Sequence, residues 1–214
     1  MVITTRLPAS VRQYLAALRA LLVFTVIVGI AYPLLITGIA QTVMPGQANG
    51  SLVHRAGSPV GSSLLGQPFV DAQGNPLPQW FQPRPSAAVN PSNSSDPGYN
   101  PGFSAASNLG PSNPDLIKKI NDRRAAIAAF DGVAPGDVPP DAVTASASGL
   151  DPDISPAYAY QQANRVAQAR GLDPAALRAF VTDHIQHRVL GVLGEPRVNV
   201  LELNLALAQL SGAR

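Results

Sequence analysis

Residues 20–40 read ALLVFTVIVGIAYPLLITGIA, an apolar run without a charged side chain. A helix rises about 1.5 Å per residue, so this run is long enough to span a hydrocarbon core about 30 Å thick. Helical bonding within the segment satisfies the backbone groups that lipid leaves without partners. We therefore expect a transmembrane helix at 20–40, a tail at 1–19 and one outer domain at 41–214.

The charges on the two sides of this run differ. Arg6, Arg12 and Arg19 precede it, and the first ionisable group after it is His54. Positive charge favours the cytoplasmic side, so we expect a single-pass protein of the cell membrane with the tail inside and the outer domain periplasmic or extracellular. A cleaved signal peptide is the alternative, because Gly38 and Ala40 precede a possible cleavage site. The run exceeds the usual apolar length of about 7–15 residues in a signal peptide, which favours a retained anchor.

Three residues of the apolar run are candidates for helix packing in the membrane. Thr25 and Gly29 are small and one turn apart, so a neighbouring helix can approach closely there. Pro33 removes the hydrogen bond to the carbonyl of Gly29 and predicts a kink. The alternative is that glycine and proline are simply common in transmembrane helices.

Composition excludes several classes of protein. The chain has 214 residues and no cysteine, which excludes disulfides, zinc–thiolate sites and a cysteine nucleophile. Three of the 15 basic residues precede residue 20, so the rest carries 12 basic and 13 acidic residues. This balance argues against a nucleic-acid partner.

The outer domain reads as an α+β domain with long loops rich in proline and glycine. Segment 41–112 has few helical signals, and we expect short strands at 63–66 and 67–71. Prolines recur through 82–114, which excludes a central strand there. Three helices are then expected at 114–130, 156–170 and 174–190.

The same two-residue pattern predicts all three helix starts. Each of the pairs Asn113-Pro114, Ser155-Pro156 and Asp173-Pro174 places a capping side chain before a proline that suits the first helical position. Gly171 and Gly191 are expected to end the second and third helices. Segment 198–210 is ambiguous, since its leucines alternate as in a strand, whereas Asn199 and Glu202 have the spacing of a capping box. We favour a helix.

A search for catalytic patterns favours a protein that is not an enzyme by itself. Both lysines, Lys118 and Lys119, fall inside a predicted helix and not in a phosphate-binding loop, and no Gly-x-Ser-x-Gly motif occurs. His184 and His187 have the spacing of two metal ligands on one helix face. His184 belongs to the apolar stripe of that helix, so we favour a buried, hydrogen-bonded histidine and predict no metal site.

Two loops rich in small hydroxyl and amide side chains are the candidate partner or nucleotide sites. Both lead toward a helix N-terminus, where free amides attract anions. The alternative is that these side chains only form caps and turns. The candidates are Ser107, Asn108, Gly110, Ser112 and Asn113 in the first loop, and Thr144, Ser146, Ser148, Gly149 and Asp151 in the second.

Long motifs resemble one known family. SNLGPSNPDL (107–116), VTASASGLDPDISPAYA (143–159), GEPRVNVLELNLAL (194–207) and RPSA (84–87) resemble the C subunit (KdpC) family of the Kdp potassium-transporting P-type ATPase. The resemblance covers nearly the whole chain. Two positions depart from the family phrase, because Ala147 replaces a glycine and Asp153 stands where a histidine is usual. A role that rests on that histidine is therefore in doubt for this chain.

The resemblance implies an accessory subunit of a high-affinity, ATP-driven potassium uptake complex. Its implied partners are the potassium-translocating membrane subunit and the ATP-hydrolysing subunit, besides the lipid bilayer. An alternative role is a catalytic chaperone that raises the ATP affinity of the hydrolysing subunit, so the expected cofactors are none of its own, with ATP possible within the complex. A different class, an anchored binding protein that works alone, also stays open.

Overall fold

The structure is a computed structural model that describes residues 8–212. The chain divides into two compact units, the first ending at Ser51 and the second beginning at Leu52, and each is described by itself. Arg6, used above for orientation, lies outside the described residues.

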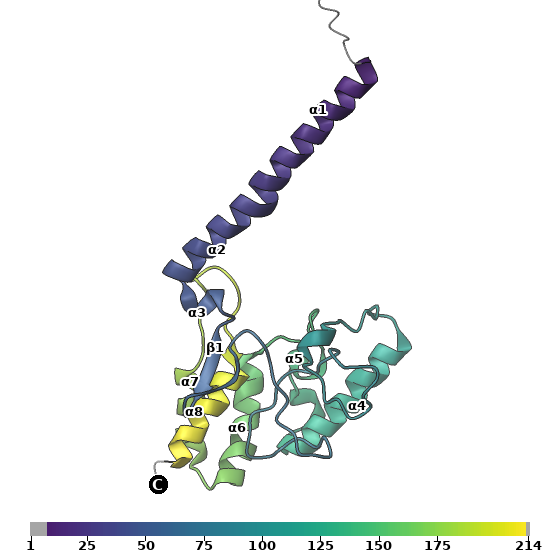
Figure 1. Cartoon of the computed structure of the whole chain (residues 1–214). Coiled ribbons are helices and arrows are strands. Elements are labelled where there is room, and N and C mark those ends of the chain that lie inside the picture. Colours follow the sequence, from purple (N-terminus) through teal and green to yellow (C-terminus); the bar gives the residue numbers. More distant parts are fainter. Residues whose placement is uncertain (1–7, 213–214) are drawn as a thin grey trace, which may run out of the picture. The chain divides into compact units, whose positions relative to one another are not determined.

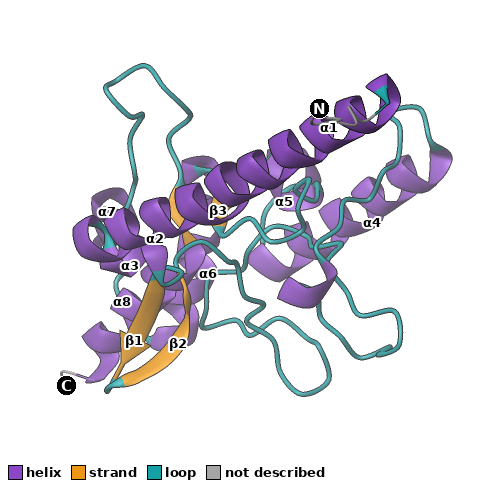
Figure 2. Ribbon diagram, turned by 45° about the horizontal axis from the view of Figure 1, so that its top comes forward, coloured by secondary structure: helices purple, strands orange, loops and turns teal. Residues whose placement is uncertain are grey.

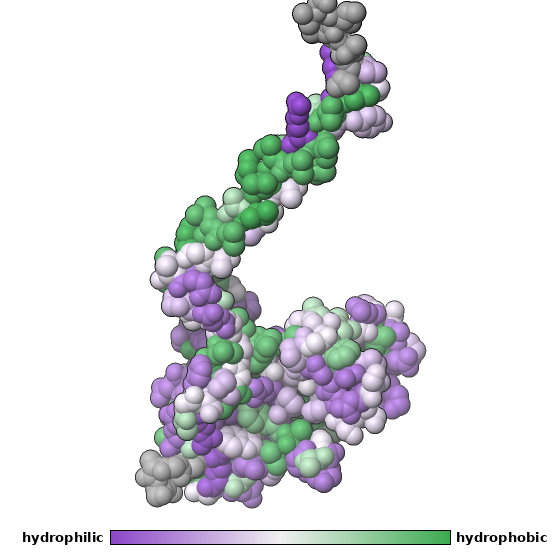
Figure 3. Space-filling model, in the orientation of Figure 1, coloured by the Kyte–Doolittle hydropathy of each residue, from purple (hydrophilic) through white to green (hydrophobic). Residues whose placement is uncertain are grey.

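The first unit is dominated by one long helix (Figure 1). Helices α1 (Ala9–Phe24) and α2 (Tyr32–Val43) are joined by the π-helical stretch η1 (Thr25–Ala31), and the short α3 (Pro45–Ala48) follows. Within the described residues, Ala9–Val43 is the one helix long and apolar enough to cross a membrane, and none of its most apolar window is buried. Apolar side chains cover most of its visible surface (Figure 3).

The π-helical stretch lies directly before Pro33. The backbone N–H of Tyr32 donates to the carbonyl of Ile27, five residues back instead of four. Proline has no N–H, and its ring clashes with the carbonyl four residues earlier in a regular α-helix. A wider π turn moves that carbonyl, so η1 accommodates Pro33 within a continuous helix, and the predicted kink stays a prediction.

The second unit begins with an antiparallel hairpin of β1 (Leu52–Arg55) and β2 (Ser58–Ser62). Its turn, Ala56-Gly57, has positive φ at both residues, as a two-residue hairpin turn of type I′ requires. The strands expected at 63–66 and 67–71 are wrong. The Leu65 amide donates to the carbonyl of Ser62 to form a turn, and Val70 forms only an isolated bridge with Pro76.

The three predicted helix starts are confirmed. Helices α4 (Pro114–Asp131), α6 (Pro156–Arg170) and α7 (Pro174–Asp183) each begin at the predicted proline. The cap side chains of Asn113, Ser155 and Asp173 accept backbone N–H bonds of 2.8, 3.0 and 2.9 Å. Gly171 ends α6 in the left-handed conformation, as expected.

The predicted end of the third helix is wrong, because α7 stops at Asp183 instead of running to 190. Gln186 exchanges two backbone hydrogen bonds with Arg197, at 2.8 and 3.0 Å, which pulls the chain into an irregular hairpin. Gly191 therefore serves the tip of that hairpin and not a helix end. Figure 2 shows this loop projecting between α7 and the following strand.

Short elements complete the second unit: η2 (Pro101–Phe103), η3 (Pro135–Asp137), α5 (Pro140–Val143) and β3 (Asp153–Ile154). Strand β4 (Val198–Asn199) pairs with β3 and leads into α8 (Val200–Gly212). The ambiguous segment is therefore a helix with a two-residue strand before it. The Oδ1 of Asn199 accepts a bond of 3.1 Å from the amide of Glu202, which is the predicted capping contact.

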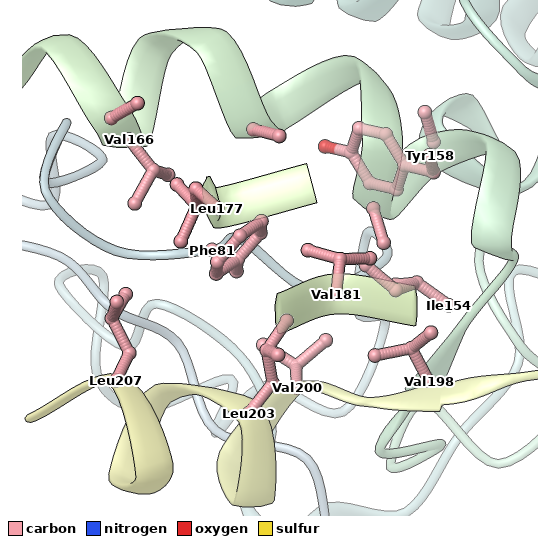
Figure 4. Packing of buried hydrophobic residues seen from close by; sticks show 14 of the residues in the cluster. Phe81, Ile154, Tyr158, Val166, Leu177, Val181, Val198, Val200, Leu203 and Leu207 are labelled. Atoms are coloured by element: carbon pink, nitrogen blue, oxygen red, sulfur yellow. The ribbon is translucent and has the colours of Figure 1, made fainter. Parts of the chain in front are cut away.

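The core of the second unit is formed by buried side chains from several helices and strands (Figure 4). Helix α6 supplies Tyr158, Val166 and several alanines, and α7 and α8 supply leucines and valines. Strands β3 and β4 add Ile154 and Val198. Phe81, from a loop, is fully buried among them. The mixed helix-and-strand character that the sequence predicted is confirmed.

Buried polar side chains fix the loop that carries Phe81. The side chain of Asn204 exchanges two hydrogen bonds of 2.9 Å with the backbone of Phe81. Gln162 binds the backbone of Gln82 in the same way, at 2.6 and 3.1 Å. Arg165 is paired with Asp131 at 2.7 Å and donates to the carbonyl of Trp80 at 3.0 Å. Satisfied groups of this kind can be buried without a large penalty, so they hold a loop where no strand exists.

Candidate functional site

The second predicted loop, residues 144–151, is docked against the proline-rich segment at 84–105. Gly149 is buried with φ at +70°, and a Cβ placed there would lie 2.7 Å from both the amide of Ala88 and the carbonyl of Ala105. A glycine is therefore required for both its conformation and the close approach. The Ala105 amide also donates to the carbonyl of Ser148 at 3.0 Å.

Arg84 connects the two segments through its guanidinium group. It forms a 3.0 Å ion pair with Asp151 and donates to the carbonyl of Thr144 at 3.3 and 3.4 Å. Asp151 uses its other oxygen to accept the amide of Asp153 at 3.0 Å. The carboxylate of Asp151 thus binds both the backbone amide of Asp153 and the guanidinium group of Arg84.

Ser86 and Tyr99 complete the docking. The hydroxyl of Ser86 donates to the carbonyl of Gly149 at 2.6 Å and accepts the amide of Tyr99 at 2.9 Å. The phenol of Tyr99 donates to the carbonyl of Arg84 at 2.8 Å. Burial, followed by the nearby charge of Asp151, raises the pKa of Tyr99, so the phenol stays protonated and remains a donor.

A cavity of about 300 Å³ lies beside this docked loop. Four carboxylates and two guanidinium groups line it: Arg84, Asp141, Asp151, Asp153, Glu195 and Arg197. Arg197 and Asp153 are 2.9 Å apart, yet the second carboxylate oxygen of Asp153 is buried without a hydrogen-bond partner. Burial raises the pKa of Asp153, and Arg197 only partly opposes that rise.

The first predicted loop is mostly free of such contacts. Ser107, Asn108, Gly110 and Ser112 are exposed, and the side chains of Ser107, Asn108 and Ser112 make no hydrogen bond to any other described residue. Asn108 has a φ of +52°, which asparagine tolerates better than most residues. Asn113 works as the cap of α4, so part of this loop is structural.

Both loops nevertheless contribute to one cavity of about 440 Å³. Ser107 lines it from the first loop and Thr144 from the second, with Lys119 and Arg123 from α4. Arg123 donates to the carbonyl of Val143 at 3.1 Å, and burial lowers the pKa of its guanidinium. The cavity therefore joins cationic and hydroxyl groups, as an anion-binding surface does. The candidates Ser146 and Ser148 lie outside it, where their hydroxyls face one another at 3.5 Å.

The three candidates for membrane packing lie on the long helix. A Cβ built on Gly29 would meet only Thr25, at an ordinary 3.7 Å. The chain itself therefore has room for a side chain at Gly29. Its packing role and that of Thr25 and Pro33 stay predictions.

The histidines behave as packing and surface residues. His184 is half-buried, and its Nδ1 lies 2.7 Å from the carbonyl of Phe180. Its ring is tilted by 44° against the Phe180 ring, with the ring centres 4.3 Å apart. His187 is exposed. Among residues 8–212, no three histidine, aspartate or glutamate side chains gather in a way that could hold a metal ion.

Sequence reasoning quoted RPSA at 84–87 but assigned no role to Arg84 or Ser86. It also missed Tyr99, whose segment carries no periodic signal. Tyr99 has a φ of +60°, and Gly98 before it has +96°. A Gly-Tyr pair among prolines is typical of a tight turn, but it does not report the hydrogen bonds of Tyr99 to Arg84 and Ser86, which lie 15 and 13 residues earlier.

Comparison with known proteins gives consistent results. The family model described as KdpC, the c chain of K⁺-transporting ATPase, matches residues 14–209. The potassium-transporting ATPase KdpC subunit of Kineococcus radiotolerans is 53% identical over 196 residues, which cover 92% of this chain and 93% of that protein. The subunit of the same name from Streptomyces coelicolor is 46% identical over 217 residues and 96% of each chain.

The matched region includes most of the long apolar helix, the docked loop and the capped helices described above. It spans more than half of the chain, and the relatives match it over nearly their whole length. The chain belongs to the KdpC family, the C subunits of potassium-transporting ATPases.

Proposed function

We propose that this chain is a non-catalytic accessory subunit that assembles or stabilises the potassium-translocating and ATP-hydrolysing subunits of a Kdp complex. The KdpC relatives are named as subunits of a potassium-transporting ATPase, which supports a role within such an assembly. The main support within the molecule is the helix Ala9–Val43, whose apolar side chains are exposed along its length. Lipid and a partner helix together cover such a surface.

The proposed topology places the N-terminus in the cytoplasm and the second unit outside. Arg12 and Arg19 lie on α1, and the first ionisable residue beyond the helix is His54. Because the chain has no native cysteine, one cysteine at the exposed Ser58 can report the side directly. Labelling of Ser58→Cys by a membrane-impermeant reagent in intact cells supports this topology, and labelling only after lysis contradicts it.

The assembly role is tested by two matched glycines of the long helix. Neither Gly29 nor Gly38 has a steric obstacle to a side chain within this chain. If Gly29 packs against a partner helix, Gly29→Leu should reduce co-purification with the two larger subunits about tenfold, and Gly38→Leu should reduce it less. A chain that purifies alone and monodisperse from membranes rich in both subunits would contradict the assembly role.

A second candidate function is contact with a nucleotide within the complex, and it requires the opposite topology, with the second unit in the cytoplasm where ATP is present. The observation in its favour is the cavity where Ser107 and Thr144 meet Lys119 and Arg123. Lys119→Gln should weaken ATP crosslinking to this subunit in the purified complex. Lys118→Gln is the control, because Lys118 is paired with Asp122 at 2.6 Å and does not line the cavity. Equal crosslinking by both variants and the unaltered complex argues against the role.

A further inference from the structure

A small hairpin between α7 and β4 exposes an apolar surface that the core does not use. We call its residues 189–193 the apolar tip, and they read VLGVL. Val189, Leu190, Val192 and Leu193 are 55%, 87%, 72% and 59% exposed. The loop projects from the second unit (Figure 2), so no other described element of that unit covers it.

The backbone of the apolar tip satisfies most of its own hydrogen bonds. Val189 and Leu193 exchange two bonds, at 2.9 and 3.0 Å. The amides of Val192 and Gly191 donate to the carbonyls of Val189 and Arg188 at 3.2 and 3.1 Å. Four of the five tip amides thus have partners inside the hairpin. Internal hydrogen bonds of this kind lower the cost of moving a loop toward an apolar medium.

Leu190 holds an unusual conformation that directs it outward. Its φ is +54°, a region that glycine or asparagine occupies at less cost than a branched side chain. A leucine in this position gains nothing from the core, since it is the most exposed large apolar residue of the described chain. Strain of this kind points to a contact outside the chain.

Polar residues form the stem below the tip. Arg188 and Glu195 form an exposed ion pair of 2.6 Å, Arg197 is paired with Asp153 at 2.9 Å, and the side chain of His187 is exposed. An apolar tip above a stem of polar and paired charged side chains matches the depth profile of a lipid surface, where apolar groups lie below the headgroups.

From these observations we infer that the apolar tip inserts into the lipid–water interface as a second, shallow membrane contact. The inference rests on the proposed membrane insertion of Ala9–Val43. Eight residues separate Val43 from Leu52, and a short tether raises the effective concentration of the tip at the membrane surface.

A protein partner fits the tip less well than lipid does. A stable protein interface covers about 800 Å² on each side, more than four aliphatic side chains provide. The residues that dominate such interfaces are tryptophan, tyrosine and arginine, whereas the tip contains only valine, leucine and glycine. A tip that adds to an existing anchor needs no such area.

The test places a fluorescent label on the full-length chain in vesicles. Single cysteines replace Leu190 in the tip, Leu34 in the long helix and Gln73 in an exposed loop, and each carries an environment-sensitive dye. The vesicles contain phosphatidylethanolamine, phosphatidylglycerol and a lipid with a shallow quencher. We expect quenching at Leu190→Cys to exceed that at Gln73→Cys about twofold, and the label at Leu34→Cys to be quenched as well.

Further variants separate the outcomes. Adding Val192→Ser should reduce quenching at position 190, whereas Leu64→Ser should not, although Leu64 is also 61% exposed. Quenching at Leu34→Cys without any at Leu190→Cys overturns this inference alone. No quenching at Leu34→Cys overturns the membrane anchor and the inference with it. Protection of position 190 from aqueous iodide only in the purified complex would assign the tip to a protein partner and overturn the lipid contact.

Discussion

The loops at 107–113 and 144–151 carry the same kinds of side chain, yet the structure treats them differently. The second loop is bound by Arg84, Ser86 and backbone groups of the proline-rich segment. The first keeps Ser107 and Ser112 exposed and uses only Asn113, as a helix cap. Hydroxyl and amide side chains therefore do not by themselves identify a binding loop. The two loops differ because a distant segment of the chain already forms hydrogen bonds with the second loop, whereas the hydroxyl groups of the first loop have no such partner among the described residues.

The largest expected contrast between the loops is at their glycines. Gly149→Ala forces a Cβ against Ala88 and Ala105 at a positive φ, so we expect a loss of unfolding free energy of about 3 kcal/mol. Gly110→Ala meets nothing within 4 Å and should change it by less than about 0.5 kcal/mol. Thermal unfolding of the full chain in detergent measures both. Equal melting temperatures would contradict the docked position of Gly149.

The ion pair of the second loop should give the next largest effect. Asp151→Asn removes the charge opposite Arg84, but keeps an oxygen that can still accept the amide of Asp153. Both partners are only partly exposed, so we expect a loss of about 1–2 kcal/mol in chemical unfolding. The exposed pair Arg188–Glu195 is the control, and Glu195→Gln should have little effect. If both variants lose the same unfolding free energy, the Arg84–Asp151 ion pair contributes no more to stability than the exposed Arg188–Glu195 pair.

The helix cap of the first loop should contribute about 1 kcal/mol. Asn113→Ala removes the acceptor of the Asp115 amide, whereas Asn113→Ser restores one of suitable geometry. Unfolding of the two variants by urea compares them directly. A full loss in Asn113→Ser would show that the amide group of Asn113 has a role other than capping.

Strand β3, which follows the second loop, should respond to pH through Asp153. Because its pKa is raised above 3.8 in the folded state, folding favours the protonated form. The stability that this group contributes is present below 3.8 and is lost as pH rises through the raised pKa. The stability difference between the unaltered chain and Asp153→Asn should therefore change over that pH range. A constant difference would contradict the burial of this carboxylate, and the first loop has no titratable residue to imitate the effect.

The smallest expected effects on stability lie in the exposed half of the first loop. Ser107→Ala and Ser112→Ala should each change unfolding free energy by less than about 0.5 kcal/mol, since neither hydroxyl has a bond to lose. The two variants are informative in the assembled complex, because Ser107 lines the cationic cavity and Ser112 does not. ATP-dependent transport reduced by Ser107→Ala alone would support that cavity, and equal transport by both would argue against it.

Local chemistry accounts for what the sequence predicts well. A cap residue before proline determines a helix start within a few residues, and all three starts were found at the expected position. The end of α7 was missed because the Gln186–Arg197 pairing is a contact between segments, and Gly191 resembles a helix end equally well. The hairpin at 52–62 was overlooked in favour of later apolar runs, although its Ala56-Gly57 turn is a local signal.

In the candidate site, too, local sequence patterns predict less than the contacts between distant segments determine. The family motifs identified the right segments, but the role of each residue depends on pairs that are far apart in the chain, such as Arg84 with Asp151 and Ser86 with Gly149. No periodicity reports a bond across sixty-odd residues of irregular chain. Gly149 was a candidate for binding, and the structure makes it first a residue of close packing.

The π-helical stretch before Pro33 has a consequence for how the span tolerates changes of length. A π turn holds more residues than an α turn, so removing one residue from Thr25–Ala31 can return the stretch toward regular bonding. Such a deletion leaves the later side chains close to their present directions, because a regular turn replaces the wider one, whereas a deletion within α1 or α2 rotates every later side chain of the span by about 100° relative to those before it. The helix would still be long enough to cross a bilayer, but the faces of its two halves would no longer match the same neighbour. For this span, the rotational position of the side chains around the helix axis is therefore a stricter constraint on insertions and deletions than the length of the helix.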